Sequence, residues 1–336
     1  MGHSTPRDPA TVAAPVRERL RISLEQVRAV LCPRSLTVLA SRPSHGKSAL
    51  ALGLATDMAR THGTRVALAC IEMSNNEVAM RLMAATASID LQRLRTGRLD
   101  DSDWLRLTRS LGTLADMNVT LIQTRMRLIQ TRMRLSLTDL VERCLKLKQR
   151  RRLDLLVVDY IQLLTADPEA SGMFCDPPEA LGRLKHLAVE LDIAVIAVSQ
   201  LSRRAEERGD QPPELGDLPE YRAAVHVADL IGLLHMCGPV RPWAQETSRA
   251  AELLVVRHRF GPTGRVDLRF DDQYCRVSDP HTSPRQPTAP GSPCPDGGGP
   301  PGGRPRRTSD QTQRATPYKQ RSPDPSTGSP GRRGVP

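Results

Sequence analysis

The 336-residue sequence is poor in aromatic side chains and has no long apolar run. Tryptophan, tyrosine and phenylalanine together make up 3% of the residues, so few rings are available on which nucleic-acid bases could stack. No segment approaches the roughly 18 consecutive apolar residues of a membrane-spanning helix, and the N-terminus lacks the apolar core of a signal peptide. We therefore expect a cytoplasmic protein with no membrane partner.

The seven cysteines lie far apart and form no C-x-x-C pair. Zinc sites bring cysteines together in closely spaced pairs, and small disulfide-bonded domains are much denser in cysteine. The arrangement favours neither a zinc site nor a disulfide framework, and it fits a reducing compartment.

Aliphatic residues are almost absent from the C-terminal segment, residues 279–336, which holds 14 of the 28 prolines. Such a segment cannot bury enough apolar surface to offset the entropy lost on ordering, so we predict a disordered tail. The N-terminal extension, residues 1–18, is predicted to be disordered as well. The remaining residues, 19–278, are predicted to form one domain, near the upper size limit for a single hydrophobic core.

The sequence carries a net charge of +11, and the predicted tail contributes nine Lys/Arg against four Asp/Glu. A basic surplus favours a polyanionic partner such as nucleic acid. A tail that only improves solubility explains its own share of the charge equally well.

Short apolar runs alternate with helix-length stretches between residues 36 and 270. Strands are predicted at 36–40, 65–71, 119–122, 153–159, 193–199, 228–234, 252–257 and 266–270, and helices at 48–61, 75–87, 101–115, 136–150 and 179–191. This alternation predicts an α/β fold with a mostly parallel, twisted sheet flanked by helices. Residues 155–158 are all apolar, as expected of a central strand covered on both faces.

The first predicted strand leads through a short loop, residues 41–48, into an alanine- and leucine-rich helix. The loop reads Ser-Arg-Pro-Ser-His-Gly-Lys-Ser, and its strand–loop–helix setting is the one that a phosphate-binding loop requires. Only the first glycine of the usual pattern is missing, since Ser41 takes its place. A chance Gly-Lys-Ser in a loop is the alternative, and the flanking elements argue against it.

A helix N-terminus offers unpaired N–H groups and partial positive charge to a phosphate. The residues that we expect to bind ATP are Ser44, His45, Gly46, Lys47 and Ser48. Lys47 would reach the β- and γ-phosphates, and the Ser48 hydroxyl would coordinate Mg²⁺.

Polar side chains recur where other predicted strands end. Glu72 follows the strand at 65–71, Asp159 ends the strand at 153–159, and Gln200 follows the strand at 193–199. The strand at 252–257 leads into Arg257 and Arg259. Because ligands bind at the carboxyl ends of strands in open parallel sheets, we expect all these residues to converge on the edge that carries the phosphate loop.

Each of these side chains matches a need of phosphoryl transfer. Asp159 supplies a carboxylate for Mg²⁺, and Glu72 polarises the attacking water. The Gln200 amide responds to the γ-phosphate. Arginines on the distal strand neutralise charge on a neighbouring subunit's nucleotide. Singly, each residue is as easily explained as an ordinary polar cap at a strand end.

The chain resembles the ATPase domain of the DnaB-type hexameric replicative helicases, within the RecA-like P-loop group. The resemblance covers about residues 30 to 277 in order. Its matching stretches are residues 42–48, 71–74 (Ile-Glu-Met-Ser), 95–104, 158–163 (Val-Asp-Tyr-Ile-Gln-Leu), 184–191, 198–203 (Val-Ser-Gln-Leu-Ser-Arg) and 257–264 (Arg-His-Arg-Phe-Gly-Pro-Thr-Gly).

The resemblance implies a RecA-like P-loop NTPase domain that hydrolyses ATP with Mg²⁺ at subunit interfaces and translocates on single-stranded DNA in DNA replication. It implies a catalytic carboxylate at Glu72, a γ-phosphate sensor at Gln200 and a trans-acting arginine finger at Arg259. Arg257 stands where a lysine is usual, which keeps the charge and alters the geometry. The implied partners are a hexameric ring of the same chain, single-stranded DNA and other replication proteins.

Three features depart from the family. Barely 30 residues precede the ATPase core, which leaves no room for the family's N-terminal helical domain. The family's Asp-Leu-Arg-Glu-Ser-Gly-Ser loop, which touches DNA backbone, reads Asp-Leu-Pro-Glu-Tyr-Arg-Ala at residues 217–223. Residues 121–127 recur unchanged as 128–134, a duplication that we interpret as a longer loop or strand end. Two copies are too few for a coiled coil, and a DNA contact through its arginines is an alternative.

Two other functions stay open at this point. The chain could be a helicase-derived ATP-binding accessory protein without unwinding activity. It could also be a RecA-like ATPase that acts in recombination or signalling.

Overall fold

The computed structural model describes residues 20–122, 125–126, 133–150, 152–166, 174–238 and 248–280. The helices are α1 Leu24–Arg28, α2 Lys47–His62, α3 Asn75–Ala87, α4 Leu91–Thr96, α5 Asp101–Asp116, α6 Leu137–Gln149, α7 Pro177–Glu190, α8 Arg203–Glu207 and α9 Tyr221–Val227, with 3₁₀ turns at Ile161–Leu163 and Leu215–Asp217. The strands are β1 Leu36–Ser41, β2 Val66–Cys70, β3 Val119–Leu121, β4 Arg125–Met126, β5 Met133–Ser136, β6 Leu155–Asp159, β7 Leu164–Thr165, β8 Ala194–Gln200, β9 Leu230–Met236, β10 Ser248–His258, β11 Gly264–Asp271 and β12 Arg276–Ser278.

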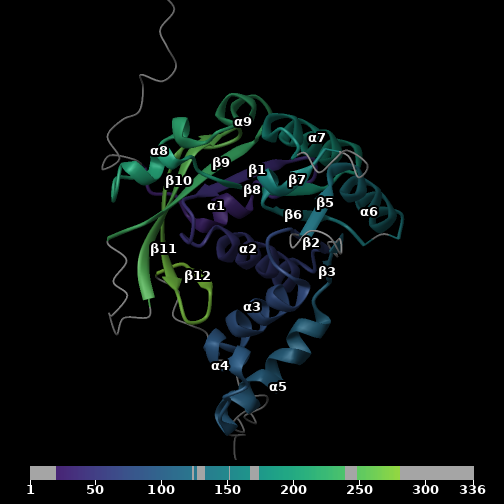
Figure 1. Ribbon diagram of the computed structural model, residues 1–336, viewed down its shortest axis with the longest axis vertical. Helices are drawn as coiled ribbons and strands as arrows, with labels where there is room; N and C mark the ends of the chain where they lie inside the picture. Colours follow the sequence, from purple (N-terminus) through teal and green to yellow (C-terminus); the bar gives the residue numbers. More distant parts are fainter. Residues whose placement is uncertain are drawn as a thin grey trace, which may run out of the picture. The chain divides into compact units, whose positions relative to one another are not determined.

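The main sheet has nine strands in the order β12-β11-β10-β9-β1-β8-β6-β2-β3 (Figure 1). From β9 to β3 all neighbouring strands run parallel, whereas β10, β11 and β12 are antiparallel to their neighbours. The prediction of a mostly parallel sheet is therefore confirmed, with an antiparallel extension at one side. The longest strand, β10, belongs to that extension.

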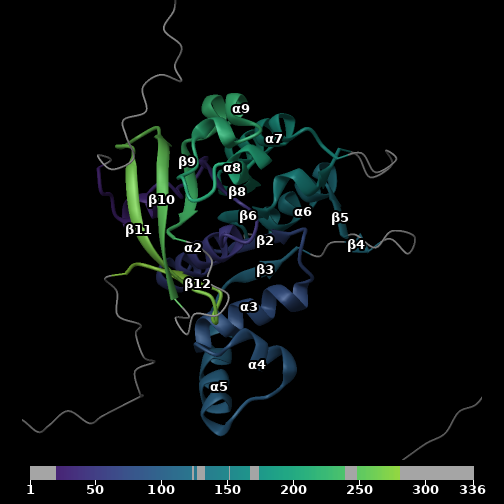
Figure 2. The same cartoon turned by 60° about the vertical axis from the view of Figure 1, so that its left-hand side comes forward.

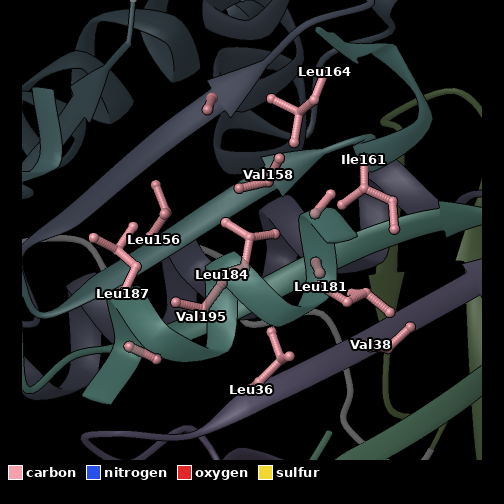
Figure 3. Close-up of a cluster of buried hydrophobic side chains, with 14 of the residues drawn as sticks. Leu36, Val38, Leu156, Val158, Ile161, Leu164, Leu181, Leu184, Leu187 and Val195 are labelled. Carbon is pink, nitrogen blue, oxygen red and sulfur yellow. The ribbon is translucent and has the colours of Figure 1, made fainter. Parts of the chain in front are cut away.

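Two apolar layers cover the two faces of the sheet, because successive side chains of a strand point to opposite sides. Leu156 and Val158 of β6 pack with Leu181 and Leu184 of α7 in one layer, as Figure 3 shows. Leu155 and Val157 of the same strand pack against α2 in the other layer. The consecutive apolar residues of β6 are thus explained by burial on both faces, as predicted.

Helices α3, α4 and α5 lie together next to the β3 side of the sheet (Figure 2). Their own small core contains Ala87, Ile89 and Leu107, with Met83 and Leu94 packed against it. Ser74 and Asp100 cap the N-termini of α3 and α5, each in a reciprocal capping box. None of the helices in the described part of the chain is long and apolar enough to cross a bilayer.

The duplicated segment is described only in part. Strands β4 and β5 come from the first and the second copy respectively, and they pair antiparallel with Arg125 opposite Arg134. The two copies therefore face each other as a short ladder, which agrees with a strand end rather than a coiled coil. The predicted tail beyond residue 280 and residues 1–18 of the N-terminal extension lie outside the described residues, so the division into three segments stays a prediction.

Candidate functional site

The loop between β1 and α2 has the backbone of a phosphate cradle. Ser44 and Gly46 adopt left-handed conformations, with φ of 59° and 81°. The 16-residue helix α2 begins at Lys47, and no side chain caps its N-terminus. A Cβ at Gly46 would lie 2.9 Å from the Phe270 ring, so both the dihedral angle and the space require glycine here. The first turn of α2 is therefore available to an anion.

Ser41 replaces the usual first glycine without strain. It is the last residue of β1, it is fully buried, and its hydroxyl donates to the Arg42 carbonyl at 2.7 Å. Arg42 donates to the carbonyls of Ala205 and Gln211 at 2.8 and 2.7 Å. The start of the loop is thus fixed to the α8 region by side-chain hydrogen bonds.

Asp159, at the end of β6, faces the first turn of α2. It is 1% exposed, and neither carboxylate oxygen has a hydrogen-bond partner among the described residues. Burial raises the pKa of Asp159, and the nearby Ser48 hydroxyl and Lys47 ammonium oppose part of that rise. The Lys47 ammonium lies 5.1 Å from the centre of the Tyr160 ring.

Mg²⁺ fits this arrangement. A buried carboxylate with two unpartnered oxygens beside a serine hydroxyl offers the oxygen ligands that a hard cation prefers. The described residues contain no cluster of three or more His, Cys, Asp or Glu side chains that could hold a metal alone. That agrees with the usual Mg²⁺ site, in which one or two carboxylates act together with substrate phosphates and water.

Glu72 lies two residues beyond the end of β2 and is exposed. The backbone brings it next to Asp159, because Cys70 pairs with Asp159 and the Ile71 amide donates to the Asp159 carbonyl at 2.7 Å. The charge of Glu72 contributes to the raised pKa of Asp159. Arg81 of α3 lowers the pKa values of both Asp159 and Cys70, and it donates to Cys275 Sγ at 3.6 Å. Sequence reasoning did not assign Arg81, and the only available signal was a basic residue two turns into the helix that follows Glu72.

Gln200 ends β8, next to the phosphate loop. It lies opposite Ser41 in the parallel ladder, and the Leu201 amide donates to the Ser41 carbonyl at 3.0 Å. The backbone amide of Gln200 donates to Gln162 Oε1 at 3.3 Å. The Nε2 of the same Gln162 side chain donates to the Ser199 hydroxyl at 2.7 Å. The structure therefore brings Gln200 to the predicted edge, with Gln162 as an unpredicted neighbour.

The expectation that Arg257 and Arg259 lie at this same edge is wrong. Strand β10 is antiparallel to β9, and His258 pairs with Leu230, the first residue of β9. The backbone amide of Arg259 donates to the Asp229 carbonyl, and the Asp229 amide donates to the carbonyl of Leu36, the first residue of β1. The rule that strand ends share an edge holds only for parallel strands.

The edge with Arg259 is organised around one buried carboxylate. Asp229 Oδ2 accepts from the Leu36 amide at 2.8 Å and from Lys185 at 2.7 Å, and Oδ1 accepts from Arg259 at 3.2 Å. Burial alone would raise the pKa of Asp229, but Lys185, the Leu36 amide and Arg259 outweigh it and leave the pKa below its usual range. Arg257 donates to the Ala228 carbonyl at 3.1 Å.

The geometry thus divides the predicted residues into two groups. The first group lies near the phosphate loop, where the parallel strands end, and consists of Ser44, Lys47, Ser48, Glu72, Asp159 and Gln200. The second group, Arg257 and Arg259, lies at the opposite edge of the sheet, where β9 begins. Six residues of β1 separate the two edges, roughly 20 Å at about 3.3 Å per residue. An arginine side chain does not span that distance.

Comparison with known proteins gives a consistent result. The family described as "DnaB-like helicase C terminal domain" matches residues 21–279. The chain is 34% identical over 266 residues to the replicative DNA helicase DnaB of Leifsonia xyli subsp. xyli, covering 76% of this chain and 54% of that protein. It is 33% identical over 240 residues to DnaB of Geobacillus stearothermophilus, covering 71% and 51%. The chain therefore spans about half the length of these relatives.

Two solved structures share the fold. One is described as an ATPase domain and superposes with a TM-score of 0.63 at 29% identity, covering 74% of this chain and 85% of the other. The second is described as a DnaB-like replicative helicase and its interactions with primase. It superposes with a TM-score of 0.61 at 28% identity, covering 74% and 57%.

Proposed function

This chain belongs to the family of DnaB-like helicase C-terminal domains, and from that premise we propose that it hydrolyses ATP with Mg²⁺ at interfaces between copies of itself. The assembly is a ring, most simply a hexamer, that translocates on single-stranded DNA during replication. Other replication proteins are its further partners.

The observation that carries this proposal is the division of the site between two sheet edges. The phosphate loop, Asp159 and Glu72 lie at one edge, and Arg259 lies at the other. Because the length of β1 separates Arg259 from the loop of its own copy, Arg259 would act on a nucleotide bound to a second copy. Arg259 is about half exposed, so a neighbouring copy can reach it.

Each residue has a defined task in this mechanism. Bound Mg²⁺ would neutralise phosphate charge, held by Asp159 and the Ser48 hydroxyl. The amide groups at the start of α2 and the Lys47 ammonium bind the phosphate oxygens. Glu72 accepts a proton from the attacking water, and its exposure keeps it accessible to that water. The partner copy's arginine stabilises charge that develops on the transferred group.

The tethered position of Arg259 suits such a task. Asp229 holds the guanidinium by one side-chain hydrogen bond, and the backbone of Arg259 is fixed by a second bond to the Asp229 carbonyl. An arginine oriented in advance loses less conformational entropy when it meets a phosphate. The finger would therefore be ordered before the ring assembles.

One observation favours a second candidate, a helicase-derived ATPase that does not unwind DNA. The segment 217–223 carries the exposed Pro219 where the family has arginine, and Asp217 is buried in an ion pair with Arg208. Exposed Tyr221 and Arg222 follow and offer a ring and a cation to a single strand. The loss of the arginine thus favours the ATPase that does not unwind DNA, whereas Tyr221 and Arg222 favour the helicase.

One set of measurements tests the proposal. Gel filtration with and without ATP reports whether a ring forms, and hydrolysis with and without single-stranded DNA reports coupling. A forked-duplex unwinding assay then separates the two candidates. Hydrolysis by a monomer, independent of protein concentration, contradicts the shared site.

A further inference from the structure

The turn between β10 and β11, residues 258–263, carries the proposed arginine finger and begins with a histidine. His258 is the last residue of β10, and its Nδ1 accepts from the Phe260 backbone amide at 3.2 Å. A backbone amide only donates, so Nδ1 holds the free electron pair and the proton of the neutral ring lies on Nε2. Asparagine makes the same bond, to the amide two residues further on, in an Asx turn. His258 therefore closes a tight turn around Arg259.

The His258 ring also packs directly against Gly261. A Cβ at residue 261 would lie 2.7 Å from His258 Cε1 and 3.0 Å from each ring nitrogen. Only glycine lets the backbone approach a side chain this closely. Among the described residues, the bond to His258 is the one side-chain hydrogen bond that residues 260–263 make. The ring thus anchors the turn at two points, Phe260 and Gly261.

The backbone of Arg259 lies between two fixed amides. Its own amide donates to the Asp229 carbonyl at 2.7 Å, and the next amide, that of Phe260, donates to His258. The Arg259 guanidinium carbon lies 5.7 Å from the centre of the Phe260 ring, within the range of a cation–π contact. Because that ring is 71% exposed, the bond to His258 is what keeps Phe260 in place beside the guanidinium.

We propose that His258 is a positioning residue for the arginine finger. Its neutral ring fixes the turn, so that Arg259 and the Phe260 ring are presented together to the neighbouring copy's nucleotide. A displacement of about 1 Å in a group that meets the reacting atoms lowers a rate by up to about a hundredfold. The inference goes beyond the tether to Asp229, and it rests on the proposed action of Arg259 in trans.

Two replacements separate the hydrogen bond from the bulk of the side chain. His258→Asn keeps an acceptor that forms the Asx turn, whereas His258→Leu keeps an apolar side chain and lacks any acceptor. His258 is only half-buried at the end of a strand, so we expect both variants to fold. Thermal unfolding checks the fold, and gel filtration checks that each variant assembles with ATP as the natural protein does.

The test is steady-state ATP hydrolysis at a protein concentration at which assembly is complete. His258→Leu should lower kcat by about tenfold to a hundredfold and leave KM for ATP within about threefold, because the phosphate loop lies at the opposite edge. His258→Asn should retain kcat within about threefold. In the Arg259→Ala background, His258→Leu should lower kcat by less than about twofold, because residues that act through one another are not additive.

Four results would overturn the inference. An unchanged kcat in His258→Leu shows that the turn needs no acceptor. An equal loss in His258→Asn shows that the hydrogen bond is not the cause. A further large loss in the Arg259→Ala background shows that His258 acts independently of the finger. Lost assembly with a normal rate per assembled subunit assigns His258 to the subunit contact. If Arg259→Ala itself leaves hydrolysis unchanged, the proposed function fails instead, so the two failures are distinguished.

Discussion

Two buried aspartates, at opposite edges of the same sheet, have contrasting surroundings. Asp159 is 1% exposed, and neither of its carboxylate oxygens has a partner among the described residues. Asp229 is 2% exposed, and its carboxylate accepts from a backbone amide, a lysine and an arginine. The pKa is raised at the first site and lowered at the second.

The contrast separates a carboxylate that stabilises the fold, Asp229, from one that is available to a ligand, Asp159. A fully partnered carboxylate such as Asp229 fixes β1, α7 and the turn after β10 to one another. An unpartnered buried carboxylate is unfavourable for folding, and sites of this kind persist where a ligand completes them. The two edges thus differ in role, although both carry residues for the same proposed reaction.

The largest expected effect concerns Arg259, because we propose that it acts at the nucleotide site of a neighbouring copy. Arg259→Ala should lower the rate of ATP hydrolysis by about 10³-fold or more, the usual contribution of an arginine finger. Mixing Arg259→Ala with Glu72→Gln subunits should partly restore hydrolysis at those interfaces that combine intact Arg259 with intact Glu72. Arg60→Ala, an exposed arginine at the end of α2, serves as the control and should change the rate less than twofold. Absence of complementation in mixed rings would argue against action in trans.

The next effect belongs to the phosphate-loop edge. Glu72→Gln removes the carboxylate and keeps its shape, so it should bind ATP and turn it over about 10²- to 10⁴-fold more slowly. Lys47→Ala should instead weaken ATP binding. Glu77→Gln is the matched control, since glutamine also fits the capping box with Ser74 at the start of α3. Equilibrium binding and single-turnover hydrolysis, measured together, show whether each variant loses ATP affinity or the rate of the chemical step. An unchanged hydrolysis rate in Glu72→Gln would reject the role of Glu72 as the base.

A smaller effect, on stability, tests the opposite edge. Asp229→Asn removes the charge that Lys185 and Arg259 share, and we expect the free energy of unfolding to fall by about 2 kcal/mol at pH 7. That is about 4–8 °C in Tm for a domain of this size. Asp272→Asn, which breaks an exposed pair with Arg249, should cost less than about 1 kcal/mol.

The pH dependence of the Asp229 effect has a definite sign. The folded-state pKa of Asp229 is lowered, so its contribution is present above the unfolded value of about 4 and is lost as the pH falls through the folded value. The stability difference between the natural protein and Asp229→Asn should therefore shrink below about pH 4. A difference that stays constant down to pH 2 would show that the charge of Asp229 is not responsible.

Most of the strands and site residues at the phosphate-loop edge could be predicted from the sequence. The eight predicted strands were observed within a few residues, because short apolar runs bounded by polar ends are what buried parallel strands require. Glu72, Asp159 and Gln200 were found as polar residues after such runs. The five predicted helices were likewise observed, whereas the short helices α1, α4, α8 and α9 give too little periodic pattern to be recognised.

The opposite edge could not be predicted in the same way. Whether β10 runs parallel or antiparallel to β9 depends on pairing in space, and the apolar pattern of the strand is compatible with both. In the sequence, Asp229 is an ordinary polar residue at the start of the strand predicted at 228–234. Only the fold brings it to Lys185 and Leu36, 44 and 193 positions away. Glu220, which is 1% exposed, was missed for a similar reason, since an acid in a polar loop gives no sign of being buried.

The smallest expected effect is a gain in stability on replacing Asp159, opposite in sign to the loss expected on replacing Asp229. Asp159→Asn replaces an unpartnered buried carboxylate with a neutral amide, so without nucleotide and Mg²⁺ the variant should be more stable by about 1 kcal/mol, a gain typical of active-site replacements. Adding Mg²⁺ and a non-hydrolysable ATP analogue should reverse the order, because a ligand stabilises the folded state in proportion to its affinity and the variant lacks the metal-binding charge. Thermal unfolding in both conditions measures the change. If Asp159→Asn is destabilising without ligand, as Asp229→Asn is expected to be, then Asp159 is a structural residue and the two edges do not differ as described.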